Sequence, residues 1–399
     1  MTIACPDCGA VQDLPQLPRG AKAVCRTCEA PLERTVGRSL DAALACSAAT
    51  LILLFPANLE PLLRVRMLGA LRESRVWSGV ADMWRGGWAI PAALIAAFVV
   101  VLPFVRFGLL TLSLGALRLG RRPAWLGPAF RWAMRLDPWA MPDVFLIGCF
   151  VGYSRVRQEL PVSIGAGGWC VITAAFLCML TRAALDRRSV WKAIRRDAQA
   201  EPGARLISCT ACDLVAPAAA EGRRCPRCGL KLRARKTDAL IRPAALIAAA
   251  FVLYWPANVY PMSKAEQLGT TTTHRIVDGI RELVQAGLWP LAVLIFCTSI
   301  AIPVLKLAAI GWMLLATRRR WRRHVRLRTR LYRLIEEIGR WSNVDVFTIA
   351  VFVPLIRFGS LASSTPAPGA VAFILVVVLT MAAARSFDPR LMWDAAEGR

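Results

Sequence analysis

Residues 88–117 read WAIPAALIAAFVVVLPFVRFGLLTLSLGAL, and Arg106 is the only charged side chain in this stretch. About 20 apolar residues suffice for a helix to cross a bilayer, because each residue adds about 1.5 Å and the hydrocarbon layer is about 30 Å thick. This stretch is longer, so we expect it to tilt, to bend near Pro91 or Pro103, or to extend beyond the membrane.

Seven further stretches have the composition of membrane spans, at 39–59, 139–154, 165–185, 240–259, 288–317, 341–361 and 368–385. Of the 399 residues, 56% are hydrophobic and only 19% charged, yet the formal net charge is +25. The basic residues fall mainly between the apolar stretches, which is typical of a multispanning membrane protein. We therefore expect an all-α polytopic fold, and the composition disfavours disorder and nucleic-acid binding.

The chain repeats itself at an offset near 200. Pro56-Ala-Asn-Leu-Glu-Pro61 corresponds to Pro256-Ala-Asn-Val-Tyr-Pro261, and Trp139-Ala-Met-Pro-Asp-Val-Phe145 corresponds to Trp341-Ser-Asn-Val-Asp-Val-Phe347. Each copy has a four-cysteine head followed by four predicted spans. Because four is even, the two copies have the same orientation across the membrane, unlike inverted repeats.

The loops predict which side each segment faces. Residues 1–38 are polar and lack the apolar core of a signal peptide. Arginines concentrate between the second and third spans of each copy, and the stretch 186–238 holds more basic than acidic residues. The positive-inside rule therefore places both cysteine heads and both termini in the cytoplasm.

The stretch from Arg318 to Arg340 contains ten arginines and reads as a helix, with Trp321, Tyr332 and several aliphatic residues interspersed. Nucleic-acid binding is one interpretation. A cytoplasmic loop between spans more often rests on an anionic membrane surface, which attracts each cation by about 1 kcal/mol. We favour the membrane interpretation and expect no nucleic-acid partner.

Eight of the 13 cysteines form four C-x-x-C pairs. The members are Cys5, Cys8, Cys25 and Cys28 in the first head, and Cys209, Cys212, Cys225 and Cys228 in the second. Two C-x-x-C turns can supply four thiolates to one tetrahedral zinc ion. We expect two structural zinc ions, because all four positions of each site are filled by protein; a thiol redox centre is the alternative.

Charged residues also occupy equivalent positions within the apolar stretches: Arg106 and Lys306 in the second span, Asp143 and Asp345 near the start of the third. Helix rise places the base and the acid of each copy at similar depth, so they can pair. A structural ion pair is one interpretation. The other is an intramembrane polar network that switches, with protons as one means of coupling.

The two Pro-Ala-Asn turns, Pro56 to Asn58 and Pro256 to Asn258, fall where the first span of each copy meets the outer surface. Proline breaks a helix and asparagine can cap the freed backbone groups, so a structural turn is the first interpretation. A docking surface for a partner is the second.

The chain shows no P-loop, nucleophile elbow or H-E-x-x-H, so we expect no enzyme activity.

With its paired cysteine heads, Pro-Ala-Asn turns, Trp-x-x-x-Asp-Val-Phe motifs and the ending Phe387-Asp-Pro-Arg-Leu-Met-Trp-Asp394, the chain resembles the paraquat-inducible protein A family over nearly its full length. The resemblance implies an inner-membrane protein that passes phospholipid to or from a periplasmic partner with MCE domains. It also implies zinc-ribbon heads and tetraspanin-like modules of four spans.

We therefore expect four parts: a zinc ribbon at 1–38, a membrane module at 39–191, a linker with the second ribbon at 192–238, and a second membrane module at 239–399. Phospholipid transport is the function that the resemblance implies. The alternative is a membrane-anchored cytoplasmic thiol or metal sensor, which would need reactive thiols and no periplasmic partner.

Overall fold

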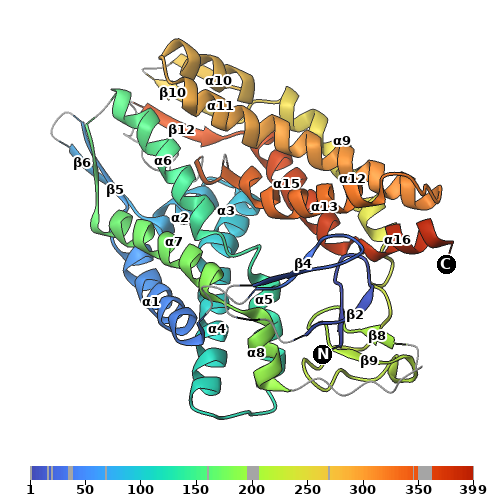
Figure 1. Cartoon of the computed structure of the whole chain (residues 1–399). Coiled ribbons are helices and arrows are strands. Elements are labelled where there is room, and N and C mark those ends of the chain that lie inside the picture. The colour runs from blue at the N-terminus through green and yellow to red at the C-terminus, as the bar shows by residue number, and fades with distance from the viewer. Residues whose placement is uncertain are drawn as a thin grey trace.

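In the computed structural model, the structure is described for residues 2–15, 18, 21–34, 39–67, 70–159, 161–195, 206–267, 270–344, 346–348 and 362–398. Most of these residues are helical, and the helices form two modules that lie side by side (Figure 1). Two three-stranded sheets lie at one end of the molecule, which we call the sheet side. Both cysteine heads lie at the opposite end, which we call the head side.

The first module begins after the first head. In chain order its elements are α1 (Leu40–Leu59), β5 (Leu63–Met67), β6 (Ala70–Ser74), α2 (Val76–Arg85), α3 (Ala89–Ile95), η1 (Ala96–Val101), α4 (Leu102–Arg118), α5 (Leu126–Leu136), α6 (Pro142–Glu159), β7 (Val162–Ile164), α7 (Ala166–Ala184) and α8 (Arg187–Ile194).

The second module repeats this order. Its elements are α9 (Ile241–Val259), β10 (Ser263–Gln267), β11 (Thr270–His274), α10 (Ile276–Gln285), α11 (Trp289–Phe296), η3 (Cys297–Ala301), α12 (Ile302–Arg318), α13 (Val325–Ile338), η4 (Gly339–Asn343), β12 (Ala362–Pro366), α15 (Pro368–Ser386) and α16 (Arg390–Glu397).

Among the described residues, five helices are long and apolar enough to cross a membrane: Leu40–Leu59, Ala89–Arg118, Ala166–Ala184, Trp289–Arg318 and Pro368–Ser386. The apolar helix Pro142–Ser154 is shorter, and α9 is not among the five. The expected span 341–361 lies mostly outside the described residues. The membrane-spanning, mainly helical fold in two repeats is therefore confirmed, while four spans per module stays a prediction.

Both long helices, Ala89–Arg118 and Trp289–Arg318, contain a π-helical segment, η1 in the first and η3 in the second. The amide of Leu102 donates to the carbonyl of Ala97, and the amide of Ile302 donates to that of Cys297, each five residues earlier. Proline follows directly, at Pro103 and Pro303. A proline ring crowds the preceding turn, and the wider π turn gives it room.

The sequence did not predict the two sheets. In the first module the strand order is β6-β5-β7, and in the second it is β11-β10-β12, all antiparallel. The first sheet joins the connection after α1 to the one before α7, and the second joins the connection after α9 to the one before α15. The strands are short and mix polar with apolar residues, so a search for continuous apolar runs passes over them.

The modules share one hydrophobic core toward the sheet side. The ring of Phe145 on α6 meets the ring of Phe347 edge-on, with centroids 5.7 Å apart. Gly148 faces the same residue, because a β-carbon built there would lie 2.7 Å from that of Phe347. Glycine thus allows α6 to approach the equivalent segment of the second module closely.

Candidate functional site

The four thiols of each head converge in the structure. In the first head, the sulfurs of Cys5 and Cys28 are 3.5 Å apart, as are those of Cys8 and Cys25. In the second head, the corresponding pairs, Cys209 with Cys228 and Cys212 with Cys225, are both separated by 3.6 Å. All eight cysteines are buried.

Four identical turns position these thiols. In the first turn, the Gly9 amide donates to the carbonyl of Cys5, and the Cys5 amide donates to that of Ala10. The residue after the second cysteine is left-handed in every turn: Gly9, Glu29, Asp213 and Gly229 have φ values of +76°, +60°, +55° and +72°. This backbone path folds the chain over the two sulfurs, and glycine adopts it without strain.

The donor chemistry of each head suits a metal ion. Within each head, all four sulfurs lie within 4.8 Å of one another. Four thiolates bound to Zn²⁺ at about 2.3 Å would lie about 3.8 Å apart, close to the spacing seen here. Each head has only short strands: β1 (Thr2–Ala4), β2 (Val11–Asp13), β3 (Lys22–Val24) and β4 (Pro31–Arg34) in the first, β8 (Leu206–Ser208) and β9 (Val215–Pro217) in the second. A metal would supply the stability that such a small core lacks.

Each head contacts the membrane module of the other copy. The first head meets α13 of the second module, where Arg333 donates a hydrogen bond of 2.7 Å to the carbonyl of Cys28. The same guanidinium lies 2.8 Å from the carboxylate of Asp7, and Arg330 pairs with Glu29. The N-terminal head is therefore held by a helix some 300 residues later in the chain.

The second head meets α5 of the first module in the same way. Arg131 donates a hydrogen bond of 2.8 Å to the carbonyl of Cys228. Gly127 lies against the backbone here, because a β-carbon built on it would be 1.9 Å from the carbonyl oxygen of Arg227. Arg131 and Arg333 occupy equivalent positions in the repeat, as do Cys28 and Cys228, so the crossed contact is itself repeated.

The predicted pairing of Arg106 with Asp143 is wrong. The buried guanidinium of Arg106 instead lies 2.5 Å from the carboxylate of Asp137, which precedes α6. Asp137 also contacts Arg182 and Arg187, each at 3.0 Å. Burial alone would raise the pKa of Asp137, but the charges of the three arginines outweigh burial and lower it.

Asp143 has other partners. Its carboxylate lies 2.5 Å from Arg182 of α7 and 3.5 Å from Arg340, which belongs to the second module. The buried Asp143 thus joins the two modules. Helix rise predicted its depth but could not show that Arg182 and Arg340 approach it more closely than Arg106 does.

Lys306 occupies the position of Arg106 in the second copy and is equally buried. Its ammonium donates to the carbonyl of Gly339 at 2.5 Å and to the hydroxyl of Ser342 at 2.7 Å. Gly339 occupies the repeat position of Asp137, so a backbone carbonyl takes the place of the carboxylate. The predicted partner of Lys306, Asp345, lies outside the described residues.

The Pro-Ala-Asn prolines do not break their helices, contrary to expectation. Helix α1 continues past Pro56 to Leu59, and α9 continues past Pro256 to Val259. The side-chain amide of Asn58 donates to the carbonyl of Leu54 at 2.7 Å, and Asn258 donates to that of Tyr254 at 2.8 Å. These bonds lie within the last turns, where proline has removed one backbone donor, so the turns remain helical.

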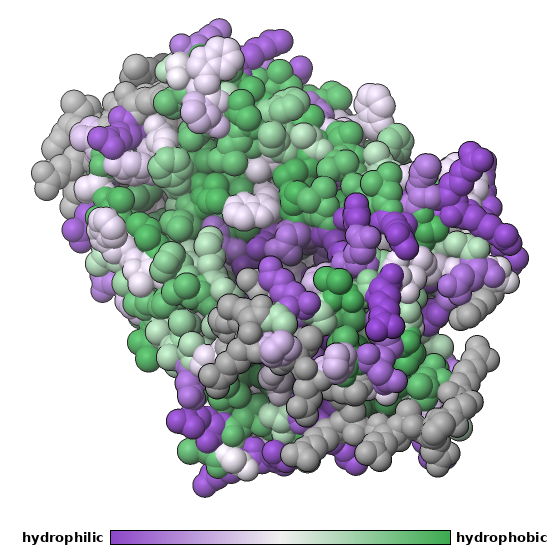
Figure 2. Space-filling view, in the orientation of Figure 1, coloured by the Kyte–Doolittle hydropathy of each residue, from purple (hydrophilic) through white to green (hydrophobic). Residues whose placement is uncertain are grey.

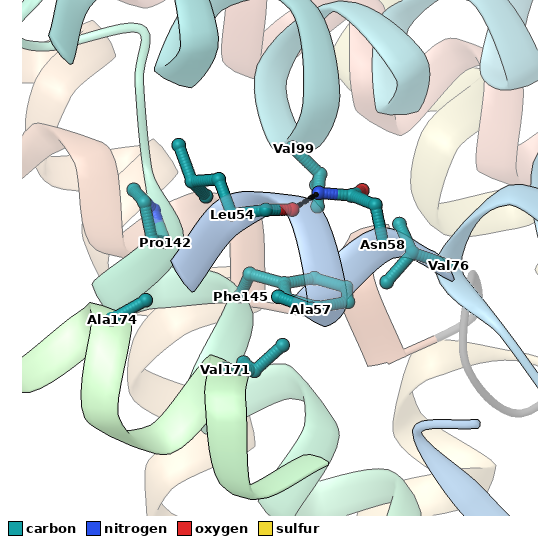
Figure 3. A pocket seen from close by; sticks show the side chains of 9 residues that line it. All are labelled: Leu54, Ala57, Asn58, Val76, Val99, Pro142, Phe145, Val171 and Ala174. Carbon is teal, nitrogen blue, oxygen red and sulfur yellow. Dashed lines mark hydrogen bonds between the residues drawn. The ribbon is translucent and has the colours of Figure 1, made fainter. Parts of the chain in front are cut away.

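Beside Asn58 lies a cavity of about 20 Å³ (Figure 3). Its walls come from α1, α2, η1, α6 and α7, and every side chain that lines it except Asn58 is apolar. A space of this size holds about one water molecule. The cavity is therefore too small to be a lipid-binding site.

The arginine-rich stretch has two different parts. Arg330 and Arg333 bind the first head, Arg340 binds Asp143, and the buried Arg328 donates to the carbonyls of Trp321 and Arg323. The buried Arg328 therefore cannot rest on lipid, and for the rest of the stretch binding to an anionic membrane surface stays a prediction. A second group of arginines, at 318, 319, 320, 322 and 323, is exposed, and Arg326 and Arg330 are exposed as well.

The residues that sequence reasoning missed are those with long-range partners: Arg131, Asp137, Arg182, Arg333 and Arg340. The repeat carried one usable signal, because Arg131 and Arg333 are separated by the same offset as the Trp-x-x-x-Asp-Val-Phe motifs. Asp137, Arg182 and Arg340 carried none, because their copies in the repeat are Gly339, Ala384 and Pro138.

Comparisons with known proteins place nearly the whole chain in one family. The sequence model of the family described as "Paraquat-inducible protein A" matches residues 40–195 and 240–397. Intermembrane transport protein PqiA of Escherichia coli (strain K12) is 31% identical, over 98% of this chain and 95% of that protein. Lipophilic envelope-spanning tunnel protein A of the same organism is also 31% identical, over 98% of this chain and 91% of that protein. No solved structure matches.

Proposed function

We propose that this chain, which belongs to the paraquat-inducible protein A family, is the inner-membrane subunit of a system that moves phospholipid between the two membranes of a bacterial envelope. The observation that carries the proposal is the match, over nearly the full length, to two relatives named for intermembrane transport and for an envelope-spanning lipophilic tunnel. Five helices suited to a membrane support it. A non-enzymatic role agrees with the relatives' names.

The partner in this proposal is a periplasmic protein with MCE domains, which would receive lipid at the sheet side. The heads and both termini would face the cytoplasm, because the exposed arginines at 318–323 lie at the end of α12 that points to the head side. Anionic headgroups of the inner leaflet would bind these arginines.

Zinc would be held by the two sets of four cysteines. When bound, the metal supplies cross-links that fold each head. Hydrogen bonds then attach each head to a membrane module: the carbonyl of Cys28 accepts from Arg333, and that of Cys228 accepts from Arg131. A sensor function is less well supported, because all eight thiols are buried and exposed thiolates are what oxidants attack.

The test is purification from the native membrane, under mild detergent, through a tag on this chain. We expect an MCE-domain protein and phospholipid to co-purify, and a depletion strain to transfer less labelled phospholipid between its membranes. A chain that purifies alone, in a strain whose depletion leaves lipid transfer unchanged, would contradict the proposal.

A further inference from the structure

Five arginines from both modules gather on the head side of the shared core. Arg106 and Arg182 come from the first module's spans and Arg187 from the start of α8, whereas Arg340 and Arg385 come from the second module. Asp137 contacts the first three arginines, and Asp143 contacts Arg182 and Arg340. Glu336 and Glu337 lie at the edge of the group, 3.9 Å from Arg385 and 3.6 Å from Arg340.

These arginines have more hydrogen-bond donors than the carboxylates can accept. A guanidinium has five N–H groups and a carboxylate accepts about four bonds, so five arginines exceed the capacity of four acids. Within the described part of the chain, the buried Nε atoms of Arg106 and Arg340 have no hydrogen-bond partner, and neither has Oδ1 of Asp143. A buried donor without a partner costs about 1–3 kcal/mol, so an acceptor that reaches it is stabilising.

The group is open to the surface of the molecule. The side chain of Arg187 is 58% exposed and that of Arg385 is 32% exposed, while Arg182 and Arg340 lie deeper. Arg187 belongs to the first module and Arg385 to the second, so both modules contribute a partly exposed arginine to the group. Figure 2 shows hydrophilic surface recessed between the apolar surfaces of the two modules.

The positions of Arg182 and Arg385 in their helices indicate which kind of anion this group of arginines would bind. Arg182 and Arg385 lie in the last turns of α7 and α15, two of the helices suited to a membrane, at their head-side ends. On α7, two to six residues before Arg182, Phe176, Met179 and Leu180 are exposed large apolar side chains. A ligand bound here would place its anionic group against the arginines, and the apolar part of the same ligand would lie along α7. Arginine binds phosphate through paired hydrogen bonds.

We propose that the recess formed by Arg182, Arg187, Arg340 and Arg385 binds the phosphate group of a phospholipid from the head-side leaflet. The inference rests on the proposed function, since it assigns a place where transported lipid is held between the modules. Asp137 and Asp143 position the arginines, and the headgroup phosphate satisfies donors that these two acids leave free.

The experiment measures binding of phosphatidylglycerol in mixed detergent micelles to the purified full-length protein by native mass spectrometry. The variants are Arg187→Gln, whose side chain is the most exposed of the four, and Arg187→Gln combined with Arg385→Gln. Arg118→Gln is the matched control, because Arg118 is 63% exposed, pairs with Asp41 and lies outside the recess. We expect the double variant to bind about ten-fold more weakly and the control to bind as the unchanged protein does.

Two further probes distinguish the source of the phosphate. Diacylglycerol, which lacks the phosphate, is expected not to bind, and inorganic phosphate is expected to compete only at much higher concentration than the lipid. Equal lipid binding by the double variant, or binding of inorganic phosphate without any preference for the lipid, would overturn the inference. If the lipid binds through these arginines but no MCE-domain protein co-purifies and lipid transfer is unchanged on depletion, the site stands and the proposed function fails.

Discussion

The guanidinium of Arg333 donates a hydrogen bond of 2.7 Å to the carbonyl oxygen of Cys28, which lies 305 positions earlier in the chain. The equivalent bond in the other half joins Arg131 to Cys228. Each cysteine head is thus attached to the membrane module of the opposite copy. The arrangement ties the two halves together on the head side, just as Phe145 and Phe347 tie them together within the core.

Arg333→Ala is expected to loosen the first head. The substitution removes the bond to Cys28 and the ion pair with Asp7, which together should cost about 1–3 kcal/mol. Proteolysis within the first head should become faster, and the unfolding temperature in detergent should fall. Arg326→Ala is the control, because Arg326 is 63% exposed and reaches Glu29 only at 4.0 Å, so its effect should be below about 1 kcal/mol.

Gly127→Ala is expected to displace the second head from α5. The new methyl group would lie 1.9 Å from the carbonyl oxygen of Arg227, and a backbone atom cannot move aside as a flexible side chain can. Overpacking of this kind costs about 1–3 kcal/mol. Gly115→Ala is the control, because a β-carbon there meets nothing within 4 Å and should stabilise the helix by about 0.5–1 kcal/mol. Equal unfolding temperatures for the two variants would contradict the observed docking.

Cys25→Ser is expected to remove one of two zinc ions and leave the other, because the two clusters do not share ligands. Elemental analysis of the purified protein should give two zinc ions per chain before the change and one after it. Cys170→Ser, in α7 and outside both clusters, should leave two. Protein that contains no metal while all eight thiols react freely would rule out the zinc assignment.

Asp137→Asn is expected to be strongly destabilising. The change leaves Arg106 buried without its anion, and breaking a buried ion pair costs about 3–5 kcal/mol. Because the folded-state pKa of Asp137 lies below its ordinary value, the stability from this carboxylate is complete above about pH 4. It is lost as the pH falls from there through the folded-state pKa. Unfolding measured from pH 7 to pH 3 should show this acid loss in the unchanged protein and a smaller loss in the variant.

Ser342→Ala is expected to weaken the hold on Lys306 without abolishing folding. The ammonium keeps the carbonyl of Gly339 and loses one acceptor, at a cost of about 1–3 kcal/mol.

Lys306→Met removes the charge altogether and tests whether the cation acts in transport. A variant that is well folded but transfers no lipid would favour a switchable network, whereas a fully active one would favour a structural role.

Local patterns in the sequence predicted the parts that depend on local physics. Thirty apolar residues around Arg106 predicted a long membrane helix, and the spacing of the C-x-x-C pairs predicted two four-thiol clusters that the structure brings together. The offset near 200 predicted two repeats, which the family match confirms. The short strands escaped prediction because they have no continuous apolar run, and because the third strand of each membrane-module sheet pairs with a segment about 100 residues earlier.

The sequence by itself determined the long apolar helices, the repeat and the grouping of the cysteines, because a bilayer and a metal site each require particular residue types at fixed short spacing. Only the tertiary structure decided that each head crosses to the opposite module and that Arg106 meets Asp137 while Asp143 meets Arg182 and Arg340. Charged residues attract any opposite charge within reach. Which partner is reached depends on how helices far apart in the chain pack, and no local pattern records that.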